Sequence, residues 1–514
     1  MKNLTLCHLM LIFFCANLLA AQQSDTSKNA DSNAVADTVI EVMTISHSKT
    51  VKSLDDVRTS DNVLIYPEQI VSAQHTVADL ISQSAGVNLN GQGGLFQSYN
   101  IRGFSRARIK TEVDGIPIIT DRRAGNSIAF IPAELISEVY IQKGPQSTLY
   151  GSDAMGGVVS ISTQSHETSA ISFALQPQDN AKHLSANFVG DTINASLVTR
   201  TADNAKSAKN EQGNATPLNS QYQQRAATLS SEFSWYDIDI FASAIVSQGD
   251  DIGKSSITFP TERISNYPQD DHLLSQIEFS SVGQWKFKLY QHQQQWQTNI
   301  TRLDDEQNFS RRNVTDYQSD TFGAYGSWLI DNTVVGLEWL GRHNIEISEQ
   351  EFSATNELAW QHQMIDADGD TFAVFTLHDW HFDDFTLATG ARYDQIKLKQ
   401  YQQTKEDSFI SLSANASYQL SKNTAMSLQL ANAFRFPIVS ELFFSGETPR
   451  GNTQGNSELT PEKSIGLQFS LTHHVNENFS ASFNGYHYKI DDYIERYTQD
   501  NVRRYRNNQQ VTIK

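Results

Sequence analysis

From about residue 168 to its end, the 514-residue chain alternates apolar residues with polar or small ones. The alternation is clearest in three runs, at 236–246, 410–420 and 465–472. Because successive side chains of a β-strand point to opposite faces, each run predicts a strand with one apolar and one polar face. Each run is about as long as the 9–11 residues with which a tilted strand crosses a bilayer. A membrane barrel and a soluble sandwich are both compatible with this pattern.

The connections between the predicted strands distinguish these two architectures. About sixteen strands fit the alternation, and the links between them are alternately short and long. The short links are 190–192, 282–284, 331–333 and 421–423, and the long ones are about 202–221, 248–270, 301–317, 346–370 and 434–462. A transmembrane barrel has short periplasmic turns at one rim and long loops at the other, whereas a sandwich needs no such regularity. The sequence therefore predicts a membrane all-β fold, an antiparallel transmembrane β-barrel with its N-terminus on the periplasmic side.

Composition excludes several classes of protein. The net charge of −19 argues against a nucleic-acid partner, since phosphate binding needs clustered Lys and Arg. Both cysteines, Cys7 and Cys15, fall in the first fifteen residues, so we expect no disulfide or thiol chemistry in the rest of the chain. No Ser-His-Asp, paired-carboxylate or phosphate-loop pattern stands out. We therefore expect neither an enzyme nor a cofactor.

Two segments are rich enough in acidic residues or histidine to be candidate metal sites. The segment Asp366-Ala367-Asp368-Gly369-Asp370 has its glycine at the fourth position, whereas an EF-hand loop has it at the sixth. The second segment contains His378, Asp379, His381, Asp383 and Asp384 at a spacing that matches no zinc template. We interpret the first as a solvated loop tip and the second as a polar periplasmic turn, and we predict no metal site.

The first fifty residues predict a leader and an arm. Residues 1–21 have the features of a secretory signal, with Lys2 at the positive end and small residues before Gln22. Residues 22–50 have few large apolar groups and predict a flexible arm. Within the arm, the β-prone segment 37–43 could add itself as an edge strand to the sheet of a partner. The alternative is that it forms the first strand of the domain that follows.

Between residues 51 and 167 the pattern mixes α and β, as in a small globular domain. Thr76 and Asp79 have the spacing of a capping box, and Gly86 is expected to end the helix that they begin. Strands are expected at 99–102, 108–113, 138–142 and 158–161, and a short helix at 132–136. The predicted domains are thus a signal peptide (1–21), an arm (22–50), an α+β domain (51–167) and the barrel (168–514).

Three motifs punctuate the α+β domain. They are Ile101-Arg102-Gly103-Phe104, Val113-Asp114-Gly115-Ile116-Pro117, and a segment from Lys143 to Thr163 that contains Gly144, Pro145, Tyr150, Gly151, Gly156 and Gly157. In order and spacing they resemble the plug domain of TonB-dependent outer-membrane receptors, and the resemblance covers about residues 37–514. It implies that the α+β domain is a plug inside the lumen of a 22-stranded barrel, in the outer membrane of a Gram-negative bacterium.

The resemblance also implies a function, the active uptake of a scarce small ligand. Thr38, Val39, Ile40, Glu41 and Val42 would then form the TonB box, which binds the TonB protein of the inner membrane. The ligand would be a metal chelate, first an iron-siderophore, with cobalamin and haem as alternatives. Residues 150–159 look like the plug of the cobalamin receptor. A passive porin or adhesin is the alternative from another functional class.

The segments 434–437 and 455–464 look like the paired boxes of haem receptors. No histidine lies between them, although haem receptors usually carry one there as the iron ligand. The other interpretation is a turn that caps the strand starting near Lys463.

Five arginines concentrate positive charge in the plug of an otherwise acidic chain, namely Arg102, Arg106, Arg108, Arg122 and Arg123. Arginines inside a barrel lumen are expected to pair with barrel carboxylates. Arg122 and Arg123, on a predicted loop, are instead the expected ligand contacts, together with Phe96 and Tyr99. Outer-membrane lipid and lipopolysaccharide would surround a monomeric barrel.

The predicted strand count is smaller than a plug requires. Barrels of 16 to 18 strands enclose an open channel, whereas 22 strands make a lumen that holds a plug. The chain stops at Lys514 without a terminal aromatic residue, and an unpaired strand edge in lipid would leave backbone groups unsatisfied. We therefore expect about six further strands to be missing, which leaves an incomplete barrel of about 16 of 22 strands.

Overall fold

The computed structural model describes residues 62–67, 76–89, 95–121, 128–163, 168–207, 215–255, 262–281, 283–476 and 479–514. The predicted signal peptide, the arm and its TonB box lie outside these residues, as do Arg122 and Arg123. No helix in the described part of the chain has the length and apolar character needed to span a membrane.

The plug is built around two small sheets. The larger has five strands in the order β1-β7-β8-β5-β6, and the smaller has the order β2-β3-β4. Neighbouring strands are antiparallel except β5 and β8, which run parallel. The elements are β1 (Asn62–Ile65), α2 (Val77–Ile81), β2 (Val87–Leu89), β3 (Tyr99–Ile101), β4 (Phe104–Ser105), η4 (Arg106–Arg108), β5 (Ile109–Val113), β6 (Ile116–Pro117), η5 (Ala133–Leu135), β7 (Glu138–Lys143), α3 (Ser147–Tyr150) and β8 (Gly157–Ser162).

Helix α2 begins where the sequence predicts. The Thr76 side chain accepts a hydrogen bond from the Asp79 backbone N–H (3.1 Å), and the Asp79 carboxylate accepts one from the Thr76 N–H (3.1 Å). This capping box satisfies donors that the first helical turn leaves without partners. The predicted end is wrong, because α2 stops at Ile81 and Gly86, with a φ of +79°, turns the chain into β2 instead.

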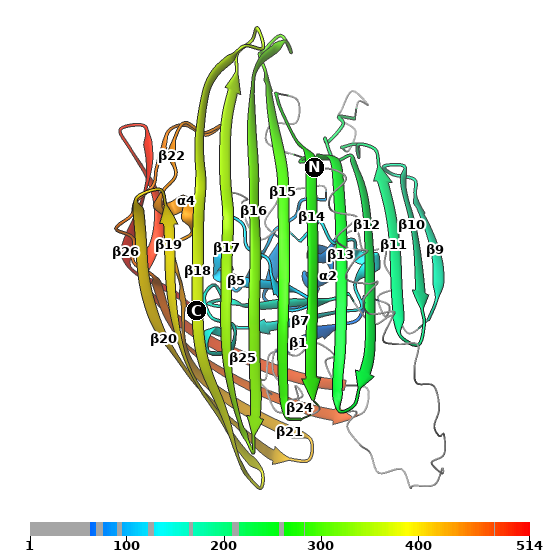
Figure 1. Cartoon of the computed structure of the whole chain (residues 1–514), viewed down its shortest axis with the longest axis vertical. Coiled ribbons are helices and arrows are strands. Elements are labelled where there is room, and N and C mark those ends of the chain that lie inside the picture. Colours follow the sequence, from blue (N-terminus) through cyan, green and yellow to red (C-terminus); the bar gives the residue numbers. More distant parts are fainter. Residues whose placement is uncertain are drawn as a thin grey trace. The chain divides into compact units, whose positions relative to one another are not determined.

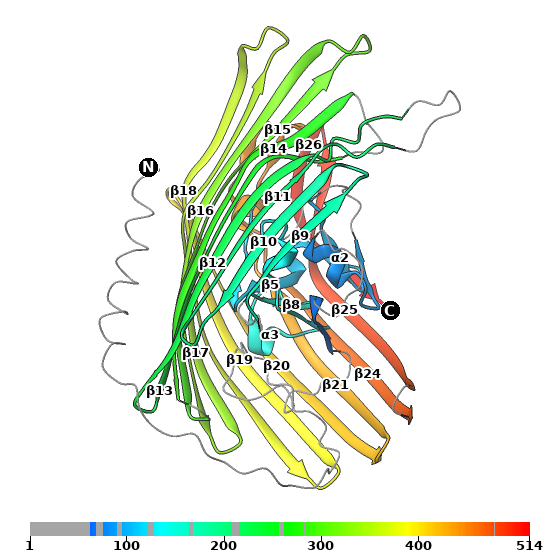
Figure 2. The same ribbon diagram turned by 90° about the vertical axis from the view of Figure 1, so that its right-hand side faces the viewer.

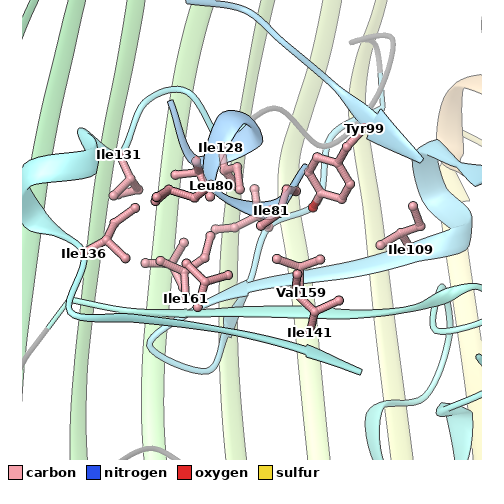
Figure 3. Close-up of a cluster of buried hydrophobic side chains, with 14 of the residues drawn as sticks. Leu80, Ile81, Tyr99, Ile109, Ile128, Ile131, Ile136, Ile141, Val159 and Ile161 are labelled. Carbon is pink, nitrogen blue, oxygen red and sulfur yellow. The ribbon is translucent and has the colours of Figure 1, made fainter. Parts of the chain in front are cut away.

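Aliphatic side chains join α2 to the larger sheet of the plug (Figure 3). Leu80 and Ile81 belong to one buried cluster with Ile141, Val159 and Ile161 of β7 and β8. All five side chains are at most 1% exposed. Since burial of each such side chain stabilises a fold by about 1.5–3 kcal/mol, this cluster holds the plug together as a domain.

In the part of the chain that the structure describes, sixteen strands of seven residues or more form the barrel sheet, in agreement with the predicted count. In Figures 1 and 2 the plug elements, blue to cyan, lie within the curve of these strands. The strands are β9 (Ala170–Gln176), β10 (Ala181–Val189), β11 (Ile193–Ala202), β12 (Tyr222–Trp235), β13 (Ile238–Gly253), β14 (Arg263–Ser281), β15 (Trp285–Leu303), β16 (Phe309–Ile330), β17 (Thr333–Phe352), β18 (Leu358–Phe382), β19 (Phe385–Gln400), β20 (Gln403–Ser421), β21 (Thr424–Arg435), β24 (Glu462–Asn476), β25 (Phe479–Gln499) and β26 (Val502–Ile513). The connection from β21 to β24 carries α4 (Val439–Leu442) and the short hairpin β22 (Ser445–Gly446) and β23 (Thr453–Gln454).

The long strands pair antiparallel with their neighbours along the chain. Each strand from β9 to β21, and then β24, β25 and β26, is in register with the next, and several of these pairings contain a bulge. The strand order of the sheet closes with β26 next to β9. However, every described pairing of β9 is with β10, and those of β26 are with β25 and β23. Among the described residues, the seam between β9 and β26 therefore has no residue register.

The two faces of the barrel strands differ as a membrane barrel requires. In β21, Met426, Leu428 and Leu430 are exposed on the outside, whereas Ser427 and Gln429 between them are buried toward the plug. Apolar side chains thus face lipid and polar ones face the lumen.

Three of the predicted long loops are wrong. The strands continue through much of 248–270, 301–317 and 346–370, so that only 254–262, 304–308 and 353–357 connect them. β18, for example, has 25 residues and includes the predicted loop tip Asp366–Asp370. At about 3.3 Å per residue such a strand is far longer than the roughly 30 Å of hydrocarbon that it crosses. Where such a strand extends beyond the membrane, water and not lipid contacts its outer face. That face then needs no apolar residues, so this part of the strand lacks the alternation that predicts a membrane strand.

Candidate ligand-binding site

A cavity of about 510 Å³ lies between the plug and the barrel, at the strand ends that adjoin the predicted external connections. The plug contributes η4 and the residues near Asp121, and the β21–β24 connection contributes α4 and the turn after β22. β14, β15, β16, β25 and β26 supply the remaining walls. Ligand pockets of proteins typically have volumes of about 300–1,000 Å³, so the cavity has the size of a small-molecule site.

Ten of the 27 residues that line the cavity are charged, and most of these ten are cationic. Seven lining residues carry a positive charge and three a negative one. The cationic residues are Arg106, Arg108, Lys254, Arg435, Arg450, Arg496 and Arg503, and the acidic ones are Asp121, Glu441 and Glu495.

Glu462 joins the plug to two parts of the barrel beside this cavity. Its carboxylate accepts hydrogen bonds from Arg108 Nε (2.8 Å) and Nη2 (2.5 Å) on the plug and from Arg435 Nη2 (3.1 Å) at the end of β21. It also accepts one from the Ile494 N–H (2.7 Å) of β25. The carboxylate is fully buried, and a charge in such a place is tolerated only because several donors surround it. Arg108 thus has the barrel carboxylate partner that was expected for plug arginines.

Asp121 makes the second contact between plug and barrel at the cavity. Arg342 Nη2 (2.6 Å) and Tyr317 Oη (2.9 Å) donate to its carboxylate from β17 and β16. From the α4 segment, the Val439 N–H donates to the same carboxylate (3.3 Å), and the Ser440 hydroxyl donates to the Asp121 backbone carbonyl (2.6 Å). One plug residue therefore holds both the barrel wall and the connection that folds back into the lumen.

Glu134 in η5 connects the plug to β10 and β11. His183 Nδ1 lies 2.9 Å from one of its carboxylate oxygens, and Arg200 Nη1 lies 3.6 Å from the other. Burial alone would raise the pKa of the Glu134 carboxyl, but the hydrogen bond from His183 and the charge of Arg200 outweigh it and lower that pKa.

Acidification is expected to weaken this contact. An acid whose pKa is lower in the folded than in the unfolded protein stabilises the folded state at any pH above the unfolded pKa, which is about 4.3 for Glu. This stabilisation is lost as the pH falls through the pKa of the folded state. Protease cleavage of the plug should therefore increase below about pH 4. In Glu134→Gln this part of the acid dependence should disappear, and an unchanged pH profile in that variant would contradict the assignment.

The predicted ligand contacts fall into two groups. Arg122 and Arg123 follow Asp121 directly but lie outside the described residues. Tyr99 is buried, its hydroxyl lies 2.6 Å from that of Thr111, and it does not line the cavity, so its position does not support ligand contact. Phe96 does not line the cavity either, but it stacks on Tyr267, which does (centroids 4.0 Å apart).

The motif residues lie where the plug meets the barrel or where its backbone turns. Arg102 donates to Gln468 and to Tyr488 (both 2.5 Å), and its guanidinium lies 4.3 Å from the ring centre of Tyr486. A barrel carboxylate was predicted as the partner of Arg102, but the described contacts are with an amide, Gln468, and a phenol, Tyr488. Gly144, with a φ of +90°, lies so close to Gln468 that a β-carbon there would overlap that side chain.

The other motif positions are turns or buried packing points. The Asp114 carboxylate accepts from the Thr163 N–H (2.9 Å) and hydroxyl (2.7 Å), and Lys288 donates to the Asp114 carbonyl (2.6 Å). Tyr150 is buried, and Pro145 lies against Gly466 of β24. The remaining glycines lie at turns or at close approaches of the backbone, namely Gly103, Gly115, Gly151, Gly156 and Gly157.

Several residues of the site were not found from the sequence. Asp121, Arg342 and Tyr317 come from segments far apart in the chain, and nothing in their spacing joins them. Arg496 lies in a strand without clear alternation. Arg435 and Glu441 lie within or beside the predicted boxes, and they form an ion pair (2.8 Å) that holds α4 against the start of β24. This arrangement agrees with the interpretation of the boxes as a structural turn.

No group of three or more His, Cys, Asp or Glu side chains suited to a metal ion occurs in the described part of the chain. Asp366, Asp368 and Asp370 lie within β18, and Asp383 and Asp384 form its turn to β19.

Comparison with known proteins identifies both domains. Residues 171–514 match the family model described as TonB dependent receptor-like, beta-barrel, and residues 54–158 match the TonB-dependent Receptor Plug Domain. The vitamin B12 transporter BtuB of Vibrio vulnificus is 39% identical over 90 residues, which cover 17% of this chain and 15% of that protein. The hemin receptor of Yersinia enterocolitica is 32% identical over 158 residues, covering 30% of this chain and 22% of its own length.

Solved structures share the fold at low identity. The copper transporter OprC superposes with a TM-score of 0.71 at 17% identity, covering 88% of this chain and 75% of that chain. The siderophore receptor PirA of Acinetobacter baumannii gives a TM-score of 0.61 at 15% identity, covering 88% of this chain and 76% of its own. Since the barrel model alone matches most of the sequence, this chain belongs to the family of TonB-dependent receptors, which are proteins of the Gram-negative outer membrane and not enzymes.

Proposed function

We propose that this chain takes part in the TonB-dependent uptake of a small metal chelate, first of all an iron-siderophore. The observation that carries the proposal is the cavity between η4 of the plug and the β21–β24 connection of the barrel. A ligand there contacts plug and barrel together, so its binding can alter the contacts by which Asp121 and Glu462 hold the plug.

The ligand remains a choice among three. The relatives include a vitamin B12 transporter, hemin receptors and a probable siderophore receptor, each matched over part of its length. No histidine is among the residues that line the cavity, which leaves haem without its usual protein ligand there. An iron-siderophore brings its own complete set of iron ligands and needs none from the protein, so it is our first choice. Cobalamin is second and haem third.

Energy for release of the ligand would come through the arm. We propose that residues 37–43 bind the TonB protein by adding a strand to its sheet, and that Arg122 and Arg123 contact the ligand. We further propose that residues 1–21 are a signal peptide, that the plug and barrel domains meet near residue 168, and that the protein acts as a monomer surrounded by lipid and lipopolysaccharide.

Deletion of residues 37–43 tests this proposal. Two uptake assays are informative, one of radiolabelled iron supplied as a ferric siderophore and one of cyanocobalamin. In the deletion variant, uptake of the transported compound should fall to the level of cells that lack the gene. Binding of the same compound to isolated outer membranes should not change, because the residues described as lining the cavity belong to the plug and the barrel. A passive porin or adhesin predicts that uptake is unaffected, and that result would refute the transport proposal.

Expression of the gene distinguishes the ligands. Induction by iron starvation supports an iron-siderophore or haem, whereas repression by cobalamin supports the vitamin. If neither condition changes expression, the three ligands named here are wrong.

A further inference from the structure

The cavity contains two arginine side chains that no other part of the described chain neutralises. Arg106 of η4 and Arg496 of β25 both line it and are both exposed. Neither side chain forms a hydrogen bond or ion pair with any described residue. The other cationic residues of the lining all have partners.

The acidic residues of the lining are already engaged elsewhere. Asp121 pairs with Arg342 (2.6 Å) and Glu441 with Arg435 (2.8 Å). Glu495, the neighbour of Arg496 in β25, pairs with Arg506 (2.5 Å). No lining carboxylate is therefore left for Arg106 or Arg496, and the cavity has an excess of positive charge.

The position of Arg106 is unfavourable without a ligand. Its backbone has a φ of +60°, in the left-handed region that is unfavourable for a residue with a side chain. Loss of hydration, followed by repulsion from Arg496 and Arg108, lowers the pKa of the Arg106 guanidinium. Strained backbone of this kind is concentrated at functional sites, where a ligand can offset its cost.

The wall formed by β14, β15 and the end of β26 is aromatic. Tyr267, Trp296 and Tyr505 all line the cavity. Trp296 stacks on Tyr317 (centroids 4.9 Å apart), and Tyr267 is held between Trp296 and Phe96. Tyr267 and Trp296 are only 6% and 2% exposed, whereas Tyr505 is partly exposed, so Tyr505 offers most of the ring surface on which an aromatic group of a ligand can stack.

We propose that the cavity binds a multiply anionic ligand built on aromatic rings, whose oxygen anions accept hydrogen bonds from Arg106 and Arg496. This inference rests on the proposed uptake function and names the chemistry of its ligand. A ferric tris-catecholate chelate and haem share that chemistry. Cobalamin does not, because the side chains of its corrin ring are neutral amides.

Binding to the purified full chain tests the proposal. The probes are ferric enterobactin, haemin and cyanocobalamin, and the variants are Arg106→Gln, Arg496→Gln and the double variant. At least one of the two anionic probes should bind to the parent protein. The affinity of the double variant for that probe should be lower by a factor of ten or more. The affinity for this probe should fall as salt rises, and less steeply in the double variant, because fewer charge contacts are then lost.

Two controls separate ligand contact from folding. Arg106→Lys keeps the positive charge, so its affinity for the anionic probe should lie between that of Arg106→Gln and that of the parent protein. Arg311→Gln removes an exposed arginine of β16 that pairs with Glu351 outside the cavity, and it should leave binding unchanged. Since Arg106 and Arg496 form no hydrogen bond or ion pair with the residues that the structure describes, their variants should reach the outer membrane in normal amounts.

The proposal is overturned if neither anionic probe binds, if the double variant binds as well as the parent, or if Arg311→Gln weakens binding equally. Cyanocobalamin uptake that requires residues 37–43 but not the two arginines would refute this inference and leave the transport proposal intact. Between the anionic probes, the one whose affinity depends on the arginines identifies the ligand as a catecholate chelate or as haem.

Discussion

Replacing Glu462 with glutamine is expected to loosen the plug from the barrel more than any other single change. The carboxylate is fully buried and receives four hydrogen bonds, from Arg108, Arg435 and the Ile494 backbone. An amide cannot neutralise the Arg108 guanidinium, which would stay largely buried without a counter-charge, whereas Arg435 would keep its ion pair with Glu441. Removing one partner of a buried ion pair usually costs about 3–5 kcal/mol, so we expect a loss of this order.

Hydrogen exchange of the plug amides in purified protein measures the effect. In Glu462→Gln, the amides of β5, which follows Arg108 directly, should exchange faster by two orders of magnitude or more, in line with a loss of about 3 kcal/mol. Glu458→Gln is the matched control, because Glu458 is exposed and lies on the same connection, and it should behave as the parent protein. Equal exchange in the parent and in Glu462→Gln would mean that other contacts suffice to hold the plug.

Replacing Asp121 with alanine should release the α4 segment into the lumen. The variant loses the partner of Arg342, which is then buried without a counter-charge, and also the acceptor for Tyr317 and for the Val439 N–H. We expect a loss of about 3–5 kcal/mol, felt first in residues 436–444 and not in the plug core. Hydrogen exchange resolved by peptide, or the reactivity of a cysteine introduced at Ser440, should show this segment opening.

A double variant separates charge from packing at the same place. In Asp121→Asn combined with Arg342→Met, both charges are absent, and the segment should regain part of its protection, since no charge is buried alone. Protection as low as in Asp121→Ala would show that geometry, and not charge balance, holds α4 in place.

Local sequence patterns predicted the elements whose cause is local. Thr76 and Asp79 mark the start of α2 because a capping box uses only neighbouring residues. β20 was recognisable from the run at 410–420, because lipid on one side and the lumen on the other impose alternation on it, with Ile410 and Leu412 exposed and Ser411 buried. The upper part of β18 meets water on its outer face, so Asp366–Asp370 looked like a loop although it continues the strand.

The candidate site was less predictable because its residues meet only through the tertiary fold. Arg108 and Glu462 are separated by 354 positions, and Asp121 and Arg342 by 221. Charge alone predicts that plug arginines pair with barrel carboxylates. It does not predict which carboxylate each arginine meets, or which arginine stays unpaired. Arg106 and Arg108 differ by two residues and have opposite roles, because η4 turns one toward Glu462 and leaves the other in the cavity.

The place of β1 in the plug has a mechanical consequence. Among the described strands, β1 is the outermost of its sheet and pairs with β7 alone, through the four registers from Asn62–Gln142 to Ile65–Val139. Tension that arrives along the chain from before Asn62 therefore loads the Asn62–Gln142 pair first and can peel β1 away one pair at a time. The registers that join β7, β8 and β5 do not depend on β1, so β1 can detach while they stay paired and the core of the plug stays folded.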